Sequence, residues 1–477
     1  MNTFDFLQKS YLFVNTFIFI YAISVSTFYI LLAIFAFKGM RRYKLKDLYF
    51  DKRIILSSEY SPALSLIAPA YNESLTVIDN IRSLLSLHYS NLEVIIVNDG
   101  SKDDTLQKCI ETFEMEPVDF AVNYAVNSKE IKTVYKAKNP AYRRLVLVDK
   151  VNGGKADALN AGINISANKH IVCIDVDCII EQDALIHMIK PFLESEERVI
   201  ATGGVIRIAN ECEFRNGNIM EVNMPTSFFP RHQVLEYLRA FLMGRMAWAE
   251  INGLMLISGA FGVFDKEIVI AVGGYDHKTV GEDMELVVRM RKYMHQKREK
   301  YKVAFVPEPL CWTEAPSSNK ILSRQRNRWT RGTIETIIMH KDIFMNPKYG
   351  VMGMISFPFW VIFEWFAPII EFTGIFLLGA MAFFGYVNWF YFWLFLTLVY
   401  CFSLFISTIS ILFEEFSYPQ YRKISHMFWL FFTAATEPFL YHPLNTWAAI
   451  RGNWDIYRGK KTWGEMTRTG FASKKTK

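Results

Sequence analysis

Hydrophobic residues occur along this 477-residue chain in two patterns, and each pattern predicts a different kind of structure. Residues 13–37 carry no charge, and a helix of that length can cross a hydrocarbon core of about 30 Å. The stretch is longer than the apolar part of a signal peptide and no small-residue cleavage site follows it, so we predict a retained transmembrane helix. Between about residues 61 and 315, short β-rich runs alternate with helical patterns, which is typical of a doubly wound α/β domain.

The α/β region contains candidate strands at residues 64–69, 92–98, 144–148, 170–175 and 199–208. The helical patterns between them begin near Glu73, Asp104 and Gly154, each with acidic or capping residues near its first turn. Residues 116–142 are polar and irregular, and we interpret them as a connection that carries a short strand or excursion.

Three apolar stretches follow the α/β region, at residues 351–386, 389–412 and 427–450. The second is uncharged, whereas acidic residues and prolines interrupt the other two. The basic run 38–46 after the first helix places the α/β region in the cytoplasm and the amino terminus outside, by the positive-inside rule. Three further crossings would put the basic tail 451–477 outside, against the same rule, so we expect one stretch to be interfacial or re-entrant.

Composition fits a membrane protein better than a nucleic-acid-binding one. Part of the net charge of +6 comes from the basic run 38–46 and from the tail, where membrane orientation accounts for it. No repeated basic and aromatic stripe suggests a nucleic-acid surface, so we expect no nucleic-acid partner. The six cysteines show no zinc-type spacing, and we expect reduced structural thiols.

Carboxylates follow two of the candidate strands directly. Asp99 ends the apolar run 94–98, and Asp175 and Asp177 end the run 171–174. A parallel strand delivers such side chains to a binding crevice at its carboxyl end. Two hard oxygen ligands at this spacing suit Mg²⁺ or Mn²⁺ that bridges a diphosphate.

Three more polar motifs occur within the α/β region and just beyond it. They are residues 153–160 (Gly-Gly-Lys-Ala-Asp-Ala-Leu-Asn), residues 281–283 (Gly-Glu-Asp) and residues 325–329 (Gln-Arg-Asn-Arg-Trp). In this order the motifs resemble those of the family 2 inverting glycosyltransferases of the membrane-embedded, processive kind. That group contains cellulose, chitin, poly-N-acetylglucosamine and hyaluronan synthases, and the resemblance covers about residues 60–335.

The resemblance implies an α/β, GT-A-like, doubly wound glycosyltransferase domain inserted between transmembrane helices of a multi-pass protein of the inner or plasma membrane, with its catalytic domain in the cytoplasm. We predict a transmembrane helix in residues 1–40, a basic linker in 41–60 and the catalytic domain in 61–315. The motif with glutamine, arginine and tryptophan, together with interfacial helices, occupies residues 316–350. Two to four transmembrane or interfacial helices occupy 351–450, and 451–477 form a basic cytoplasmic tail.

The resemblance also assigns roles to single residues. The turn at 69–73, with the strand before it, matches the opening nucleotide-binding turn, and residues 98–101 match the motif of the uracil-contacting acid. The residues to which it gives nucleotide-sugar contacts are Ala68, Tyr71, Glu73, Asp99, Lys155, Asp175 and Arg328. The acceptor-side residues are Ser258, Gly259, Gln325 and Trp329, and the metal motif is Asp175 and Asp177.

Elementary chemistry gives the main residues roles of the same kind. Negative charge grows on a diphosphate when its bond to the sugar breaks, so Lys155 and Arg328 supply fixed positive charge there, together with a metal held by Asp177. The attacking hydroxyl must lose a proton, and a carboxylate can accept it as general base. The resemblance implies Asp283 for this role, because the family places the base at the last position of the motif, and Glu282 is the neighbouring alternative. The ring of Trp329 offers a face to the C–H face of an acceptor sugar.

One departure from the family pattern is visible in the base motif. The family usually has threonine before the acidic pair, and this chain has Gly281. Acceptor-side detail taken from cellulose synthase is therefore less secure. Only 26 residues follow Arg451, and we expect no carboxyl-terminal cyclic-dinucleotide-binding domain of the kind found in many bacterial cellulose synthases.

We predict a processive inverting enzyme that polymerises a UDP-hexose into a β-linked polysaccharide and passes it across the membrane, and we favour UDP-glucose and a β-glucan. The alternatives are a UDP-GlcNAc-using synthase of the poly-N-acetylglucosamine or chitin type, and a single-addition lipid glycosyltransferase. Expected partners are the UDP-sugar, the growing polysaccharide, membrane lipid, and accessory export or regulatory subunits. A dinucleotide oxidoreductase or a nucleotide-binding transporter is opposed by the absence of a GxGxxG motif after the first strand.

Overall fold

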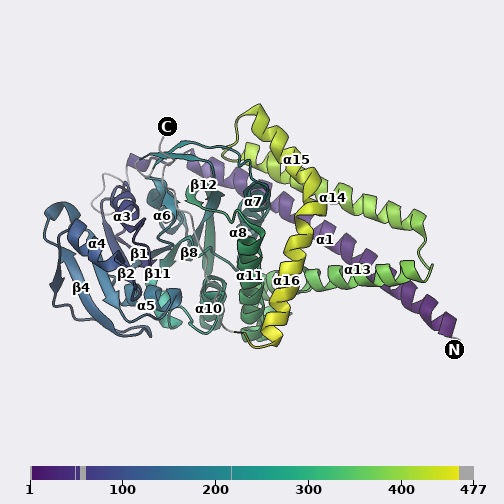
Figure 1. Cartoon of the computed structure of the whole chain (residues 1–477). Helices are drawn as coiled ribbons and strands as arrows, with labels where there is room; N and C mark the ends of the chain where they lie inside the picture. The colour runs from purple at the N-terminus through teal and green to yellow at the C-terminus, as the bar shows by residue number, and fades with distance from the viewer. Residues whose placement is uncertain (1–2, 49, 54–60, 216–217, 461–477) are drawn as a thin grey trace.

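The computed structural model describes residues 3–48, 50–53, 61–215 and 218–460, and a ten-stranded mixed sheet forms the centre of this part of the chain (Figure 1). The strand order is β3-β4-β5-β2-β1-β6-β11-β8-β12-β7. The bounds are β1 Leu64–Ala70, β2 Leu92–Asn98, β3 Met115–Val118, β4 Ile131–Ala137, β5 Leu145–Lys150, β6 His170–Ile174, β7 Ile179–Ile180, β8 Arg198–Ile208, β11 Phe261–Asp265 and β12 Tyr301–Thr313. A separate hairpin pairs β9 Glu213–Arg215 with β10 Asn218–Glu221.

All five strands that the sequence predicts are present, and the α/β class is confirmed. Strands β1, β2, β5 and β6 run parallel to one another, so their carboxyl ends meet at one edge. The irregular connection 116–142 contains β4, and β3 begins just before it, so the connection carries parts of two antiparallel strands rather than one. Strands β11 and β12 had not been predicted, and β11 makes the sheet mixed because it runs antiparallel to β6 and β8.

Helices cover the sheet and connect its strands. Those of the α/β region are α3 Val77–Leu85, α4 Thr105–Thr112, α5 Lys155–Ile165, α6 Ala184–Glu194, α9 Lys266–Ala271 and α10 Glu282–Lys297. A second group comprises α7 Phe228–Tyr237, the π-helical segment η2 Leu238–Gly244, α8 Arg245–Glu250 and α11 Asn319–Met339. The short helices are η1 Pro140–Tyr142, η3 Lys341–Ile343, η4 Pro347–Tyr349, η5 Met352–Ser356, α12 Phe357–Phe359 and η6 Trp360–Trp365.

The remaining helices are α1 Thr3–Asp47, α13 Ala367–Phe383, α14 Trp389–Phe416, α15 Ile424–Leu440 and α16 His442–Tyr457. Among the described residues, three helical stretches are long and apolar enough to cross a membrane: Phe13–Asp47, Met352–Phe383 and Trp389–Phe416. The first stretch is part of α1, the second includes α13 and the third is α14, and these helices extend away from the sheet on one side (Figure 1).

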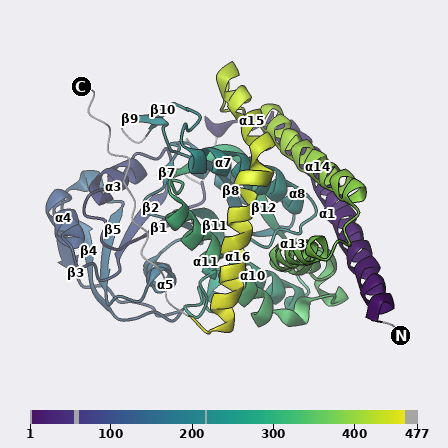
Figure 2. The ribbon, with the colours of Figure 1, turned by 45° about the vertical axis from the view of Figure 1, so that its right-hand side comes forward.

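The third apolar stretch, residues 427–450, is divided in the structure. Residues 427–450 do not form one helix, because α15 ends at Leu440 and α16 begins at His442. Helix α16 instead lies along α11, against the catalytic side of the molecule (Figure 2). In the described part of the chain, two candidate spans follow the α/β region.

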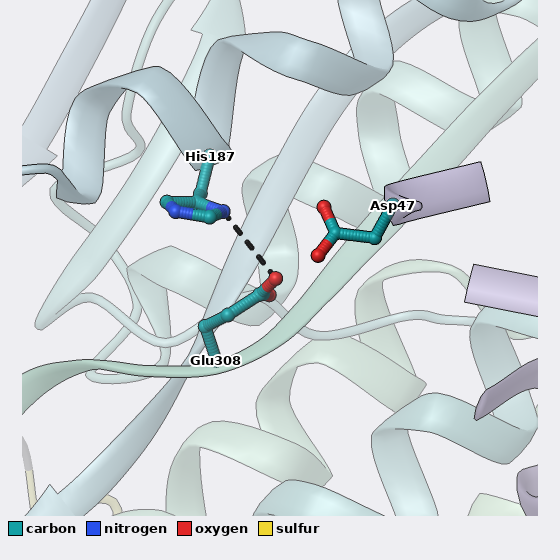
Figure 3. Close-up of side chains that lie close together, drawn as sticks. All are labelled: Asp47, His187 and Glu308. Atoms are coloured by element: carbon teal, nitrogen blue, oxygen red, sulfur yellow. Dashed lines mark ion pairs between the residues drawn. The ribbon is translucent and has the colours of Figure 1, made fainter. Parts of the chain in front are cut away.

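A cluster of charged side chains joins the end of α1 to the sheet domain. Asp47, His187 on α6 and Glu308 on β12 point toward one another (Figure 3), with His187 Nδ1 at 3.3 Å from Glu308 Oε1. Their ligand-type atoms lie within 4.8 Å of one another, a spacing that could hold a metal ion. The ammonium of Lys190, however, already lies 2.7 Å from Asp47 Oδ1, and the Tyr418 hydroxyl donates to Glu308 at 3.0 Å. We therefore interpret the cluster as a structural contact between α1 and the sheet domain, and not as a metal site.

A second buried pair joins the sheet to α14. Arg207 on β8 and Glu414 on α14 are both almost fully buried, and Arg207 Nη2 lies 2.6 Å from Glu414 Oε2. The backbone N–H of Gln420 donates to the other oxygen of Glu414 at 3.1 Å. Because each charge is removed from water, loss of one partner leaves the other uncompensated.

We expect Glu414→Gln to destabilise the protein by about 3–5 kcal/mol, because the substitution leaves the Arg207 charge buried without its carboxylate. The midpoint of thermal unfolding in detergent measures the effect. Glu415→Gln is the matched control, since its side chain is exposed and the same substitution should cost less than about 0.5 kcal/mol. Equal midpoints for the two variants would contradict the assignment.

Candidate active site

The turns that follow β1 and β2 interlock at the carboxyl edge of the sheet. The backbone N–H of Asp99 donates to the carbonyl of Ala70 at 2.9 Å, and the N–H of Asn72 donates to the Ser101 hydroxyl at 3.0 Å. Asn72 has a φ of 56°, which the tight turn after β1 requires. Tyr71 is exposed beside this turn. The two turns thus form one continuous surface at the carboxyl edge of the sheet, as expected for parallel strands that end side by side.

Asp99 is buried within these turns, and backbone and side-chain donors occupy both of its oxygens. Oδ1 accepts from the Gly153 N–H at 2.9 Å, and Oδ2 accepts from the Gly154 N–H at 2.7 Å. The Asn152 amide also donates to Oδ2, at 3.2 Å. The carboxylate therefore fixes the glycine loop that leads into α5, and the uracil contact that the resemblance implies stays a prediction. Ala68 is likewise fully buried, inside β1, so its side chain has no open face toward a ligand.

Lys150 is a residue of the site that the sequence reasoning missed. It is fully buried at the end of β5, with its ammonium 2.7 Å from Asp99 Oδ1 and 2.5 Å from Asp157 Oδ1. The buried ammonium therefore joins the end of β5 to two carboxylates, one after β2 and one on α5. The available signal was a lysine two residues after the predicted strand 144–148 and three residues before the glycine pair, which is weak without a structure.

Lys155 and Asp175 meet across the sheet edge. Lys155 Nζ forms an ion pair with Asp175 Oδ1 and donates to the Gly259 carbonyl at 3.4 Å. Burial disfavours the charged ammonium, but the nearby carboxylates of Asp175 and Glu282 outweigh it and raise the pKa of Lys155. Lys155 therefore remains a fixed positive charge at the end of the metal motif.

The metal motif offers the right donor atoms for a divalent cation. Ligand atoms of Asp175, Asp177 and Cys178 all lie within 4.8 Å of one another. Carboxylate oxygens are the ligands that Mg²⁺ and Mn²⁺ prefer, so the pair Asp175 and Asp177 fits such an ion.

The predicted base lies at the first turn of α10. Asp283 Oδ2 accepts from the Gly259 N–H at 3.1 Å, and Oδ1 accepts from the N–H of Met284 at 2.8 Å. The neighbouring Glu282 is buried, and this burial raises its pKa. Strand pairing explains the contact with Gly259, because β11 begins directly after that loop and lies beside β6.

A cavity of about 1650 Å³ connects these groups with the membrane helices. The predicted site residues on its wall are Lys155, Asp175, Ser258, Gly259, Glu282, Asp283, Gln325, Arg328 and Trp329. Its far part is lined by residues of α1, α13 and α14. The predicted residues Ala68, Tyr71, Glu73, Asp99 and Asp177 lie outside this wall, and Glu73 is occupied at the start of α3, where it accepts from the Thr76 hydroxyl at 3.0 Å.

Helix α11 presents the arginine–tryptophan motif to the cavity. Arg326 stacks over the Trp329 ring at 4.2 Å and pairs with Glu236 Oε2 at 2.7 Å. Trp329 also packs against Phe241, with ring centroids 5.8 Å apart. Arg326 is therefore a buried partner of the tryptophan and not a membrane-surface charge.

The base loop and α11 touch through two glycines. A Cβ added to Gly332 would lie 2.6 Å from the Cα of Gly281, and a Cβ on Gly281 would lie equally close to Gly332. Gly281 occupies the position where the resembling family usually has threonine, and this contact explains the difference. A side chain at either position would separate the base loop from the helix that carries Trp329.

Fold and site together define a glycosyltransferase of the nucleotide-sugar type with an α/β catalytic domain. The model of glycosyltransferase-like family 2 matches residues 62–332, and the chain belongs to that family. This family match confirms the resemblance on which the residue roles rest.

The chain is similar to curated bacterial enzymes over its catalytic part. It is 27% identical over 327 residues to the poly-β-1,6-N-acetyl-D-glucosamine synthase of Staphylococcus epidermidis, an alignment that covers 68% of this chain and 66% of that enzyme. The alignment thus spans just under two thirds of the relative's length. The synthase of the same name from Staphylococcus aureus is 27% identical over 334 residues, with 70% of this chain and 68% of the relative covered.

Among solved structures, a mannosyltransferase from Pyrobaculum calidifontis in complex with GDP-Man and Mn²⁺ aligns with 91% of this chain and 99% of its own. The sequence identity is 16% and the TM-score 0.49.

We expect Gly332→Ala to lower turnover by up to about 10²-fold, because the added methyl group displaces α11 from the base loop and a shift of about 1 Å can cost that much. The overpacking itself should cost about 1–3 kcal/mol. Turnover and thermal unfolding are measured together. Gly379→Ala is the control, since a Cβ at that helical glycine meets no atom within 4 Å, and wild-type behaviour of both variants would overturn the role of the contact.

Proposed function

We propose that this protein is a processive, inverting synthase that transfers N-acetylglucosamine from UDP-GlcNAc to a growing β-linked polysaccharide. The single observation that carries the proposal is the continuous cavity from Lys155 and Asp175, past Asp283, to the membrane helices. The curated relatives support the sugar, because their names specify poly-β-1,6-N-acetyl-D-glucosamine. Our sequence-based preference for UDP-glucose finds no support in these relatives, and the GlcNAc alternative fits them better.

The proposed reaction is a one-step displacement at the sugar C1. An acceptor hydroxyl attacks C1, its proton passes to Asp283, and the bond from C1 to the UDP oxygen breaks on the opposite face. Such general-base catalysis typically contributes ~10²- to 10⁴-fold. Inversion converts an α-linked donor into a β-linked product. The backbone donors from Gly259 and Met284 orient the Asp283 carboxylate for this role.

Positive charge supports the leaving diphosphate in this proposal. Lys155 is held beside the metal motif by Asp175, and Arg328 lies on the same cavity wall. Asp177 and Asp175 would hold Mg²⁺ or Mn²⁺, which supplies Lewis-acid stabilisation when bound. Asp99, Tyr71 and Glu73 belong to the nucleotide side, where Asp99 acts through the glycine loop that it fixes.

In this proposal the acceptor lies on the other side of Asp283 from the leaving diphosphate. Trp329 offers a ring to the sugar, Gln325 offers hydrogen bonds, and the loop at Ser258 and Gly259 borders Asp283. From there the cavity continues between α1, α13 and α14, a direction in which an extended chain could leave. This continuity favours processive synthesis over a single addition to a lipid.

The arrangement in the cell follows from the same proposal. The protein is placed in the inner or plasma membrane as a multi-pass enzyme with a cytoplasmic catalytic domain. The domain boundaries at 40, 60, 315, 350 and 450 remain those predicted from the sequence. Membrane lipid and accessory export or regulatory subunits are the proposed further partners.

We expect the purified protein, supplied with Mn²⁺ or Mg²⁺, to form polymer from radiolabelled UDP-GlcNAc and much less from UDP-glucose. EDTA should abolish synthesis, because Asp175 and Asp177 hold the cation. Digestion of the product with linkage-specific hydrolases identifies the linkage. Polymer formed mainly from UDP-glucose would reject the proposed sugar, and a glycolipid with one added sugar would favour the single-addition enzyme.

We expect Asp283→Asn to reduce polymer formation by at least ~10²-fold while UDP-GlcNAc binding survives, because the substitution keeps the shape of the side chain and removes its basicity. Binding is measured by calorimetry and synthesis by incorporation of label. Asp119→Asn, the same change at an exposed position outside the cavity wall, is the control. Near-normal turnover of Asp283→Asn would transfer the role to Glu282, for which Glu282→Gln is the decisive variant.

A further inference from the structure

One buried cation on the cavity wall has no carboxylate partner. Arg245 begins α8, is 6% exposed and lines the cavity. Its guanidinium lies over the Phe241 ring, 4.1 Å from the centroid. Within the described ranges 3–48, 50–53, 61–215 and 218–460, the structure shows no hydrogen bond or ion pair from this guanidinium to a carboxylate.

Two other arginines on the same wall have carboxylate partners. Arg239 Nη2 lies 2.6 Å from Glu437 Oε1, and Arg326 Nη2 lies 2.7 Å from Glu236 Oε2. A buried charge is costly unless it is paired. That cost is visible for Arg245, since burial lowers its pKa to about 10 against the opposing effect of Asp283. Arg245 is therefore a buried charge on the cavity wall without a carboxylate partner in the described part of the chain.

Arg245 belongs to a different structural element from the groups proposed to hold the diphosphate. Lys155 belongs to α5 and pairs with Asp175 at the sheet edge. Arg245 instead follows the π-helical segment η2, on a helix that packs against the membrane-crossing helix α1. Asp283 interacts with the surroundings of both cations. It accepts a hydrogen bond from the Gly259 loop beside Lys155, and its charge acts on Arg245.

Aromatic rings beside Arg245 complete a surface that suits a sugar. Phe241, which lies under the guanidinium, packs against Trp329 with centroids 5.8 Å apart. Ring faces accommodate the C–H faces of sugars, and a guanidinium offers five N–H donors and no acceptor. A ligand on this surface must therefore present oxygen acceptors next to an apolar face.

We propose that Arg245 binds the terminal sugar of the acceptor chain and donates to the carbonyl oxygen of its acetamido group. This assignment rests on the proposed function, because the acetamido group belongs to a GlcNAc acceptor. Arg245 is then a specificity-determining residue on the acceptor side. It selects acceptors that carry an amide carbonyl over those that carry a hydroxyl at the same carbon.

The test compares two measurements on Arg245→Met in the full-length protein. The first is the affinity for UDP-GlcNAc, measured by calorimetry, and the second is elongation of short β-linked GlcNAc and glucose oligosaccharides at saturating donor. We expect donor affinity within about twofold of wild type and kcat/KM for the GlcNAc acceptor lowered at least ~10-fold, with a smaller loss for the glucose acceptor. Arg245→Lys keeps the charge but loses the planar fork, so its kcat/KM for the GlcNAc acceptor should lie between those of the wild type and Arg245→Met.

Arg231→Met is the matched control. Arg231 also stacks on an aromatic ring, 4.4 Å from the Trp429 centroid, but lies outside the cavity wall, so its loss should leave both measurements unchanged. Thermal unfolding of each variant shows whether a loss reflects misfolding. If Arg245→Met unfolds, Arg245→Lys provides the comparison.

Each outcome decides the proposal. An equal loss of donor affinity would make Arg245 a donor-side residue, and unchanged elongation would remove it from the site. Equal losses for GlcNAc and glucose acceptors would overturn the acetamido contact. Failure of the proposed function is distinguishable, because it shows in the wild type as absence of synthesis from UDP-GlcNAc. In that case, donor affinity and elongation are measured for Arg245→Met with the sugar that the wild type uses. A wild-type polymer that contains no GlcNAc also overturns the acetamido contact.

Discussion

The distance between the proposed base and the acceptor wall depends on one backbone contact, Gly281 against Gly332. The first glycine precedes α10, which carries Asp283, and the second follows Trp329 on α11. Two backbones approach this closely only where neither residue has a Cβ. Because α11 is also covered by α16, the contact fixes the sheet domain, the tryptophan motif and the carboxyl-terminal helices relative to one another. The cavity between them exists in its present form because of this constraint.

Charge pairing is the second organising constraint of the site. The fold places cations at the sheet edge and along the cavity, and most of those described have a carboxylate partner, such as Asp175 for Lys155 and Glu437 for Arg239. Pairing removes much of the cost of burying them. It also keeps them ionised and oriented before a substrate binds, which is what preorganised electrostatic stabilisation requires. Arg245 departs from this pattern, because its guanidinium contacts the Phe241 ring and has no carboxylate partner among the described residues.

Several elements and site positions followed from local patterns, and others did not. The strands before Asp99 and Asp175 are apolar runs that end in acids, so their positions could be predicted directly. Strand β12 contains Pro307 and Pro309, which read as breaks, and its register shifts between Val306 and Cys311 where it passes them. Residues 427–450 read as one apolar stretch, although α15 and α16 form separate helices. Hydropathy measures composition along the chain and cannot show which neighbours cover a helix.

The sequence by itself determined the family, the α/β class, the order of the motifs and the residue types that the chemistry needs, because these depend on short stretches of chain. Only the tertiary structure decided how those residues are used. Asp99 is committed to Lys150 and the glycine loop, and Arg245 lines the cavity without a counterion, although neither fact is visible in local sequence. The partners of Asp99 lie 51 or more residues away along the chain. Asp283, whose charge acts on Arg245, belongs to a separate element. Packing alone therefore brings these residues together.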